Sequence, residues 1–393
     1  MLIPRSINIE LVANTWPNST LPPAFTGIGS SDIVDVAAVL NLIGVLTTPP
    51  LSGGASLSEL WAFIRYLFAI TQDPDLRLTS EFLDMDPHQK TILSDDFGMG
   101  FTMHWLAQRL DLIAACDGRY FIENHLHRIG GTYSGGTAKR GLGKSPDFIA
   151  FDSAGRFHVI ECKGTQSSIG YRNRQLRDSG LAQKQTVQFP VNLAGERLCA
   201  GIFIAGPDGD ETSMRVIDPE PREKYQVKES EKSESSGAVA QGFLAKQLRT
   251  AGFPRTASAV AFPWQRRNFD ELEVRAETRD KWDERIGHGL DEISSAGARR
   301  FLVKGREYFG RSTILDLPRP ISVRSGLYDK VEIRQGINRE NFEDVRDLVQ
   351  NRRSIEMGDS ENIVGRYAVG ERMGRAWMMI GNSFYCDLRF RRS

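Results

Sequence analysis

The sequence predicts an α/β (α+β) protein whose core has the order α, β, β, β, α, β, with a mostly helical region before it and an α+β region after it. Apolar residues recur at helical spacing before residue 117, and three short apolar runs follow. A polar, helix-compatible segment and a further apolar run come next. The 393 residues correspond to two or three domains of ordinary size, and a hydrophobic content of 40% is enough to bury a core.

Residues 1–98 form the predicted N-terminal region, in which we expect two helices. Ser31-Asp32 can cap the first helix, whose apolar positions follow the spacing of one buried face. A Pro- and Gly-rich segment interrupts the chain, and Ser56 and Glu59 then have the spacing of a capping box. The aromatic and aliphatic stripe that follows predicts a second helix packed in the core.

Residues 99–219 form the predicted core domain. Its first helix ends at Asp117-Gly118, and the apolar runs after it are short and rich in β-forming residues. The expected helices are residues 101–116 and 172–188, and the expected strands are residues 120–126, 146–151, 156–162 and 198–205.

Residues 220–237 are predicted to be a charged linker or exposed loop, because they contain almost nothing that could be buried. Residues 238–393 form the predicted C-terminal α+β region. Its expected helices are residues 239–248 and 342–349, and its expected strands include residues 301–303 and 376–380.

Composition excludes several classes of protein. Fifty basic and fifty acidic side chains give a net charge of zero, so a polyanionic partner must be met by a local patch. The nearly apolar run at residues 36–46 is too short to cross a bilayer, and the first residues lack the apolar core of a secretory signal. Four dispersed cysteines form no metal or redox motif. We therefore expect a cytoplasmic protein without a membrane partner.

The segment PDFIAFDSAGRFHVIECKG places charge on one face of an apolar strand. Successive side chains of a strand alternate between faces, so Glu161 and Lys163 point to one side and Cys162 to the other. A carboxylate and an ammonium on such a strand are costly unless that face meets other charges. A divalent metal ion and a phosphate would satisfy both.

The turn between the two strands decides whether a second carboxylate joins this face. A three-residue loop at residues 153–155, with Gly155 in the left-handed conformation, sets Asp147 opposite Glu161. A four-residue loop would shift the register by one and turn Asp147 to the other face. The loop length therefore decides whether the two carboxylates share one face, unless a bulge intervenes.

Pro146-Asp147, followed after thirteen residues by Glu161-Cys162-Lys163, resembles the motif of the PD-(D/E)xK nuclease superfamily, which has the restriction-endonuclease-like fold. The predicted αβββαβ order is similar to the core of that family, and the resemblance covers roughly residues 101–205. It implies that Asp147, Glu161 and the backbone carbonyl of Cys162 bind Mg²⁺, with Mn²⁺ as a substitute. It also implies that Lys163 orients the attacking water or helps to deprotonate it.

The chemistry of these residues agrees with that implication. A small number of hard oxygen ligands suits Mg²⁺, which keeps several waters and shares phosphate oxygens. Lys163 beside two carboxylates should stay protonated, which favours positioning and charge stabilisation over a role as general base. An ordinary surface ion pair is the alternative.

Two neighbouring features are candidate parts of the site. Glu123 could be the additional acid that many members of the family carry near the first core strand, or a solvated glutamate at a strand end. The glycine-rich segment before Pro146 carries Lys139, Arg140 and Lys144, which suit a phosphate-contacting loop. A solvent-exposed loop is the equal alternative, and the P-loop motif is excluded because a strand follows where a helix should begin.

The resulting hypothesis is a Mg²⁺-dependent nuclease acting on nucleic acid, most simply on double-stranded DNA, as an endonuclease of bacterial restriction or anti-phage defence. The neutral net charge favours an enzyme that needs a partner subunit, dimerisation or a trigger to engage its substrate. A catalytically inactive nucleic-acid-binding or scaffold protein with the same fold is the main alternative. A metal-dependent hydrolase of another phosphoester is a third.

Overall fold

The computed structural model describes most of the chain from residue 4 to residue 393. The described residues exclude 52–65, 127–136, 139–140, 143–144, 184–186, 219–224, 228, 263–275, 324–325, 352–354, 356–366, 373–374 and 382.

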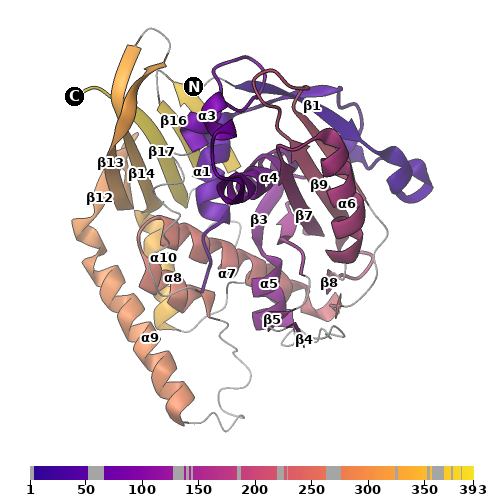
Figure 1. The fold of residues 1–393 in the computed structure, drawn as a ribbon. Helices are drawn as coiled ribbons and strands as arrows, with labels where there is room; N and C mark the ends of the chain where they lie inside the picture. Colours follow the sequence, from indigo (N-terminus) through magenta and orange to yellow (C-terminus); the bar gives the residue numbers. More distant parts are fainter. Residues whose placement is uncertain are drawn as a thin grey trace.

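The protein is mixed α/β and is built around two large sheets (Figure 1). The first is a mixed sheet in which seven described strands have the order β2-β1-β10-β9-β7-β6-β3. The second is antiparallel, and its six described strands have the order β12-β13-β14-β17-β16-β15. Helix α1 (Val36–Leu46) lies between them, because it packs on α4 of the first sheet and on β16 of the second (Figure 1).

The long helices and the paired strands of the central part of the first sheet follow the predicted order α, β, β, β, α, β, but a short helix and a π-helical turn lie between the first two strands. Strand β6 pairs antiparallel with β3 and β7, whereas β7 and β9 run parallel. The elements are α4 (Pro87–Arg109), β3 (Leu112–Asp117), β6 (Phe148–Asp152), β7 (Phe157–Thr165), α6 (Ile169–Gln183) and β9 (Ala194–Phe203).

The first helix and the first strand of this core lie earlier in the chain than predicted. Asp86 caps α4 by accepting a hydrogen bond from the amide of His88 at 2.8 Å, and Pro87 fits the first turn. The helix stops before Asp111, which has a positive φ of 50°. The apolar residues after it form β3, and residues 120–126, predicted as a strand, instead form α5 (Gly118–Phe121) and a π-helical turn (Ile122–Leu126). The prediction of a helix through residue 116 is wrong.

Helices cover both faces of this sheet. Gly164 of β7 lies against α4, whereas Gly201 of β9 lies against Leu176 and Arg172 of α6. Lys163 and Gly201 are register partners, so the side chain of Lys163 points to the α6 face. The charged residues of β7 therefore lie on the face opposite α4.

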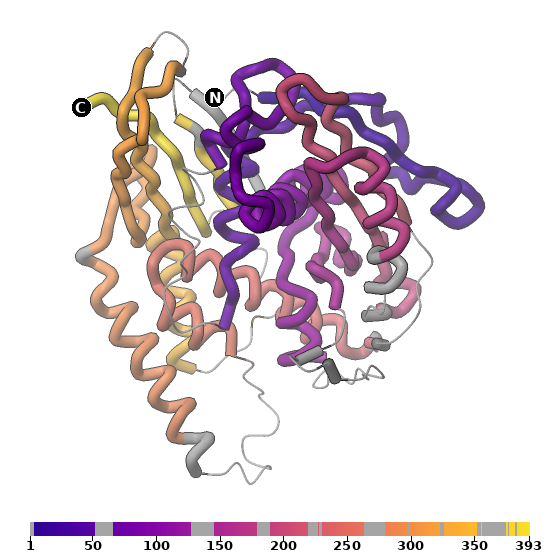
Figure 2. Tube along the Cα trace, in the orientation of Figure 1, coloured from indigo at the N-terminus to yellow at the C-terminus, as the bar shows by residue number. Residues whose placement is uncertain are grey.

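The N-terminal region contributes strands as well as helix. Strand β1 (Arg5–Leu11) pairs parallel with β10 (Ser213–Ile217) and antiparallel with β2 (Ser31–Val34). Figure 2 shows this indigo N-terminal trace running beside the later part of the sheet. Ser31-Asp32 therefore begins a strand, and the residue that caps α1 is Asp35, whose carboxylate accepts from the amide of Ala38 at 2.8 Å. Most of the helix predicted after residue 56 lies outside the described residues.

The C-terminal region combines the second sheet with a group of helices. Helix α7 begins at Lys232, inside the segment predicted as a linker, and its residues from Ser235 onward are buried. The predicted helices at 239–248 and 342–349 and strands at 301–303 and 376–380 are present within longer elements. The helices are α7 (Lys232–Thr250), α8 (Pro254–Ala261), α9 (Ala276–Ser295) and α10 (Arg339–Gln350); the strands are β12 (Arg300–Val303), β13 (Arg306–Val323), β14 (Gly326–Asn338), β15 (Tyr367–Arg372), β16 (Arg375–Ile380) and β17 (Phe384–Arg391).

One hydrophobic core joins these parts. The same buried cluster includes Ile7 of β1, Ile160 of β7 and Val239 of α7. A short helix, α3 (Ser80–Leu83), and two small ladders, β4–β5 (Thr137–Ala138 and Gly141–Leu142) and β8–β11 (Val187–Gln188 and Tyr225–Gln226), complete the described α-helices and strands. Over the described ranges, the structure contains no helix with the length and apolar character needed to span a bilayer.

Candidate active site

The turn between β6 and β7 has the three-residue form, the one of the two alternatives that puts both carboxylates on one face. Gly155 has a φ of 74°, and the amide of Asp152 donates to the carbonyl of Arg156 at 3.0 Å. The ladder pairs Phe148 with Ile160, so Asp147, one residue before β6, lies opposite Glu161. The register is the one expected for the three-residue loop, and both carboxylates belong to the same face.

Hydrogen bonds join Asp147 directly to the residues of β7. The amide of Cys162 donates to Asp147 Oδ2 at 2.8 Å, and the amide of Asp147 donates to Glu161 Oε2 at 3.2 Å. The ammonium of Lys163 donates to Glu161 Oε1. Only 7% of the Glu161 side chain and 17% of the Lys163 side chain are exposed, so the cluster lies at the boundary of the interior.

The two acids of this cluster share one lysine, and burial favours the neutral form of each acid. Burial and the neighbouring Asp147 raise the pKa of Glu161 to about 8. Burial also raises the pKa of Asp147, against the attraction of Lys163. For Lys163, burial alone would lower the pKa, but the carboxylates of Glu161 and Asp147 hold it above its ordinary value. The lysine stays protonated, and ionisation of both acids would leave one negative charge without a partner.

Helix α4 reaches the end of β7 through two glycines. A Cβ on Gly98 would lie 2.4 Å from the backbone nitrogen of Gly164, and a Cβ on Gly164 would lie 1.7 Å from the carbonyl oxygen of Ser94. Only glycine permits backbones this close. The contact brings Asp95 within electrostatic reach of Lys163 and Asp147, and burial raises the pKa of Asp95.

Asp117 is a second acid that the sequence analysis missed. It ends β3, and the amide of the next residue, Gly118, donates to the carbonyl of Asp147 at 2.9 Å. Burial raises the pKa of Asp117, while Lys246 of α7 opposes that rise by donating to Asp117 Oδ1 at 2.7 Å. The signal that could have found Asp117 is its position at the end of the apolar run LIAAC, read instead as the end of a helix.

Glu123 does not lie on a strand. It belongs to the π-helical turn after α5, and its carboxylate forms an exposed ion pair with Arg119 at 2.9 Å. The acid that the first core strand carries is Asp117. The predicted strand position of Glu123 is therefore wrong.

The glycine-rich segment before Pro146 is described only in part. Lys139, Arg140 and Lys144 lie outside the described residues, and the described residues next to them form the short β4–β5 ladder.

The carboxylate oxygens of Asp147 and Glu161 suit Mg²⁺ both in ligand type and in number. In the described part of the chain, no three His, Cys, Asp or Glu side chains come together closely enough to hold a metal ion. Mg²⁺ commonly uses one or two protein carboxylates and completes its shell with waters and substrate phosphate, which Asp147 and Glu161 could support. Cys162 alternates with Glu161 and Lys163 along β7, so its side chain points to the other face of the sheet and its backbone carbonyl is the group that it could contribute.

No family model, curated protein or solved structure matches this chain.

Proposed function

We propose that the protein is a Mg²⁺-dependent nuclease with a restriction-endonuclease-like core, which hydrolyses phosphodiester bonds in nucleic acid. The observation that carries the proposal is the position of Asp147 opposite Glu161, with Lys163 bonded to Glu161. A DNA endonuclease of bacterial defence is the form of this activity that we favour. The core supports it through its element order and through helices on both faces of a sheet in which β7 and β9 run parallel.

Asp147 and Glu161 are the residues that would hold Mg²⁺. Bound there, the ion would lower the pKa of a water and neutralise charge that develops on the phosphate. The raised pKa values of both acids support this role, because a bound cation would balance the second negative charge when both acids ionise.

Lys163 would act as a donor. Because its pKa is raised, its ammonium can hydrogen-bond a water or a non-bridging phosphate oxygen and stabilise negative charge there. The hydrogen bond from Lys163 to Glu161 fixes the ammonium beside the two carboxylates. A water or phosphate held by the ammonium would therefore lie close to an ion held by the carboxylates. Asp95 would add negative potential that favours a cation over a bare phosphate, whereas Lys246 balances the charge of Asp117.

Cleavage assays on plasmid, linear DNA and RNA in Mg²⁺ test this function. Asp147→Asn, Glu161→Gln and Lys163→Met should each reduce cleavage by about 10²-fold or more, the scale on which single catalytic groups act. Glu123→Gln is a matched control, because it makes the same change as Glu161→Gln at an exposed glutamate. Cleavage that survives Asp147→Asn and Lys163→Met would overturn the proposal.

A nucleic-acid-binding protein that has lost the reaction is the second candidate. Both oxygens of Glu161 and one oxygen of Asp147 already accept hydrogen bonds within the protein. Lys163 donates to Glu161 Oε1, the amide of Asp147 donates to Glu161 Oε2, and the amide of Cys162 donates to Asp147 Oδ2. Binding of nucleic acid without cleavage of any of the three substrates would favour this alternative.

A further inference from the structure

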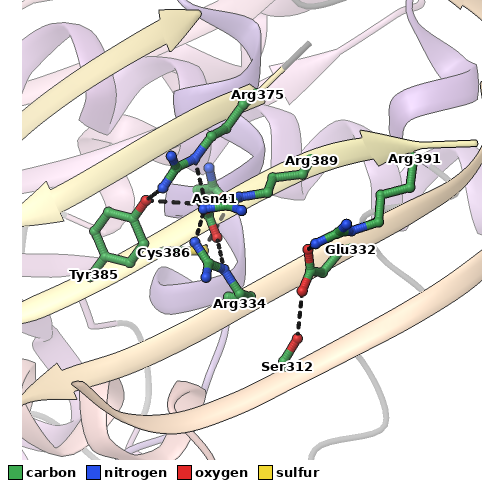
Figure 3. Close-up of polar contacts among 10 residues, drawn as sticks. Asn41, Ser312, Glu332, Arg334, Arg375, Tyr385, Cys386, Arg389 and Arg391 are labelled. Atoms are coloured by element: carbon green, nitrogen blue, oxygen red, sulfur yellow. Dashed lines mark hydrogen bonds and ion pairs between the residues drawn. The ribbon is translucent and has the colours of Figure 1, made fainter. Parts of the chain in front are cut away.

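The outward face of the six-stranded sheet carries a group of four arginines. Along β17 the thiol of Cys386 points inward and donates to Asn41 of α1 at 2.9 Å. The side chains of Arg389 and Arg391 point to the opposite, outward face of the strand. Arg334 of β14 and Arg375 of β16 lie beside them on the same side (Figure 3). We call these four residues the arginine face.

Three of the arginines converge on one buried carboxylate. Arg334 binds Asp387 through two hydrogen bonds of 2.9 Å, and Arg375 and Arg389 donate through Nε at 2.6 and 2.7 Å (Figure 3). Burial alone would raise the pKa of Asp387, but these guanidinium groups hold it below its ordinary value. The carboxylate is therefore ionised and still leaves the centre positively charged.

The fourth arginine extends this charge along the sheet. Arg391 donates through Nε to Glu332 at 2.7 Å, and Ser312 donates to the other oxygen of Glu332 at 3.0 Å (Figure 3). The face thus sets four guanidinium groups against two carboxylates. Arg375 and Arg389 are about one-quarter exposed and Arg391 is 48% exposed, so solvent reaches the positive charge.

Aromatic side chains lie among the cations. Lys304 lies over the ring of Trp377 at 5.2 Å, and the guanidinium of Arg334 lies over the ring of Phe301 at 5.1 Å. Both rings are partly exposed. Proteins that bind single-stranded nucleic acid combine two components: cations that contact the phosphate backbone, and aromatic rings on which the bases stack.

We propose that the arginine face binds a single strand of nucleic acid. The phosphates lie along Arg375, Arg389 and Arg391, and a base stacks near Trp377. The choice of nucleic acid over another polyanion rests on the proposed nuclease function. Because the whole chain has no net charge, a local group of this kind is what holds a polyanion.

Anisotropy of a fluorescein-labelled single-stranded oligonucleotide in EDTA tests the proposal without requiring cleavage. Arg391→Gln should weaken binding about fivefold at ~0.1 M salt and reduce the slope of log K against log salt by about 0.7, the single-strand value for one lost phosphate contact. Arg346→Gln is the matched control, because Arg346 is 42% exposed and is likewise paired with one carboxylate, Glu343.

Glu332→Gln should have the opposite effect on binding of the single strand. It removes the carboxylate that holds Arg391, so single-strand binding should tighten, whereas damage to the sheet would weaken binding in both variants. Trp377→Leu should weaken binding to the single strand more than to a duplex of the same sequence. Melting curves check that each variant is folded.

The proposal is overturned if the wild type does not bind the oligonucleotide, if Arg391→Gln behaves like Arg346→Gln, or if Glu332→Gln weakens binding. Tighter binding of a duplex, or of poly-glutamate, would also overturn it. If the variants change binding as expected but no substrate is cleaved, the arginine face is supported and the proposed nuclease function is overturned. If the protein cleaves nucleic acid but the variants do not change binding as expected, the nuclease function is supported and the arginine face is overturned.

Discussion

The amide of Cys162 donates to Asp147 Oδ2 at 2.8 Å, so the acid that precedes β6 is anchored to the strand that carries Glu161 and Lys163. The position of Asp147 therefore depends on the backbone of β7 rather than on a side-chain rotamer alone. The hairpin turn fixes the register, and the hydrogen bond fixes the carboxylate, which together bring the two acids to one point.

Stability of the metal-free protein should fall as pH rises. The pKa of Glu161 is raised from 4.5 to about 8, so the folded state holds a proton that the unfolded state releases. Its contribution to stability is therefore full below 4.5 and is lost as pH rises toward 8, by an amount on the order of a few kcal/mol. Thermal melts in EDTA between about pH 5 and about pH 8 measure the trend.

Glu161→Gln should flatten this dependence, because the amide does not titrate. Glu123→Gln should leave it unchanged. Mg²⁺ binds the ionised form of the acids, so it should raise the melting temperature more near pH 8 than near pH 5. An equal pH slope in wild type and Glu161→Gln would contradict the assignment of the shift to this carboxylate.

Lys246→Met should destabilise the protein strongly. Lys246 is buried and donates both to Asp117 Oδ1 at 2.7 Å and to the carbonyl of Leu46 at 2.6 Å. Removing one partner of such a pair leaves an uncompensated charge, at a cost of about 3–5 kcal/mol in the free energy of unfolding. Urea unfolding measures the loss.

Neutralising the partner should recover part of that loss. The double variant Lys246→Met with Asp117→Asn should be more stable than Lys246→Met alone, because no carboxylate is then left without its cation. Lys330→Met is the control, since Lys330 forms a more exposed pair with Asp316 at 3.7 Å and should cost less than about 1 kcal/mol. A double variant no more stable than the single one would show that Asp117 does not need Lys246.

Local sequence signals predicted the parts of the site that are close in the chain. The sequence left a three-residue and a four-residue loop open, and the three-residue loop with Gly155 in the left-handed conformation gives the β6–β7 register and the shared face of Asp147 and Glu161. The first strand was missed because the run LIAAC suits a helix as well as a strand. The end of α4 was also missed, because the residue that adopts the left-handed conformation after the helix is Asp111 and not a glycine.

Residues brought in by long-range packing could not be found in this way. Asp95 reaches the site because α4 rests on β7, and nothing near Asp95 in the sequence indicates that contact. The pairing of β1 with β10 likewise joins segments separated by most of the core domain, so the N-terminal strand was not expected in the sheet.

Gly98→Ala tests whether the close approach of α4 positions the site. The added Cβ would lie 2.4 Å from the nitrogen of Gly164, so the helix must move away from β7, at a cost of about 1–3 kcal/mol in unfolding free energy. Cleavage should fall as well, because Asp95 and the end of β7 shift relative to Asp147. Gly287→Ala is the control, because nothing lies within 4 Å of its added Cβ in the helix α9, and it should stabilise the protein by about 0.5–1 kcal/mol. Gly98→Ala with wild-type stability and cleavage would mean that the helix is free to move without disturbing the acids.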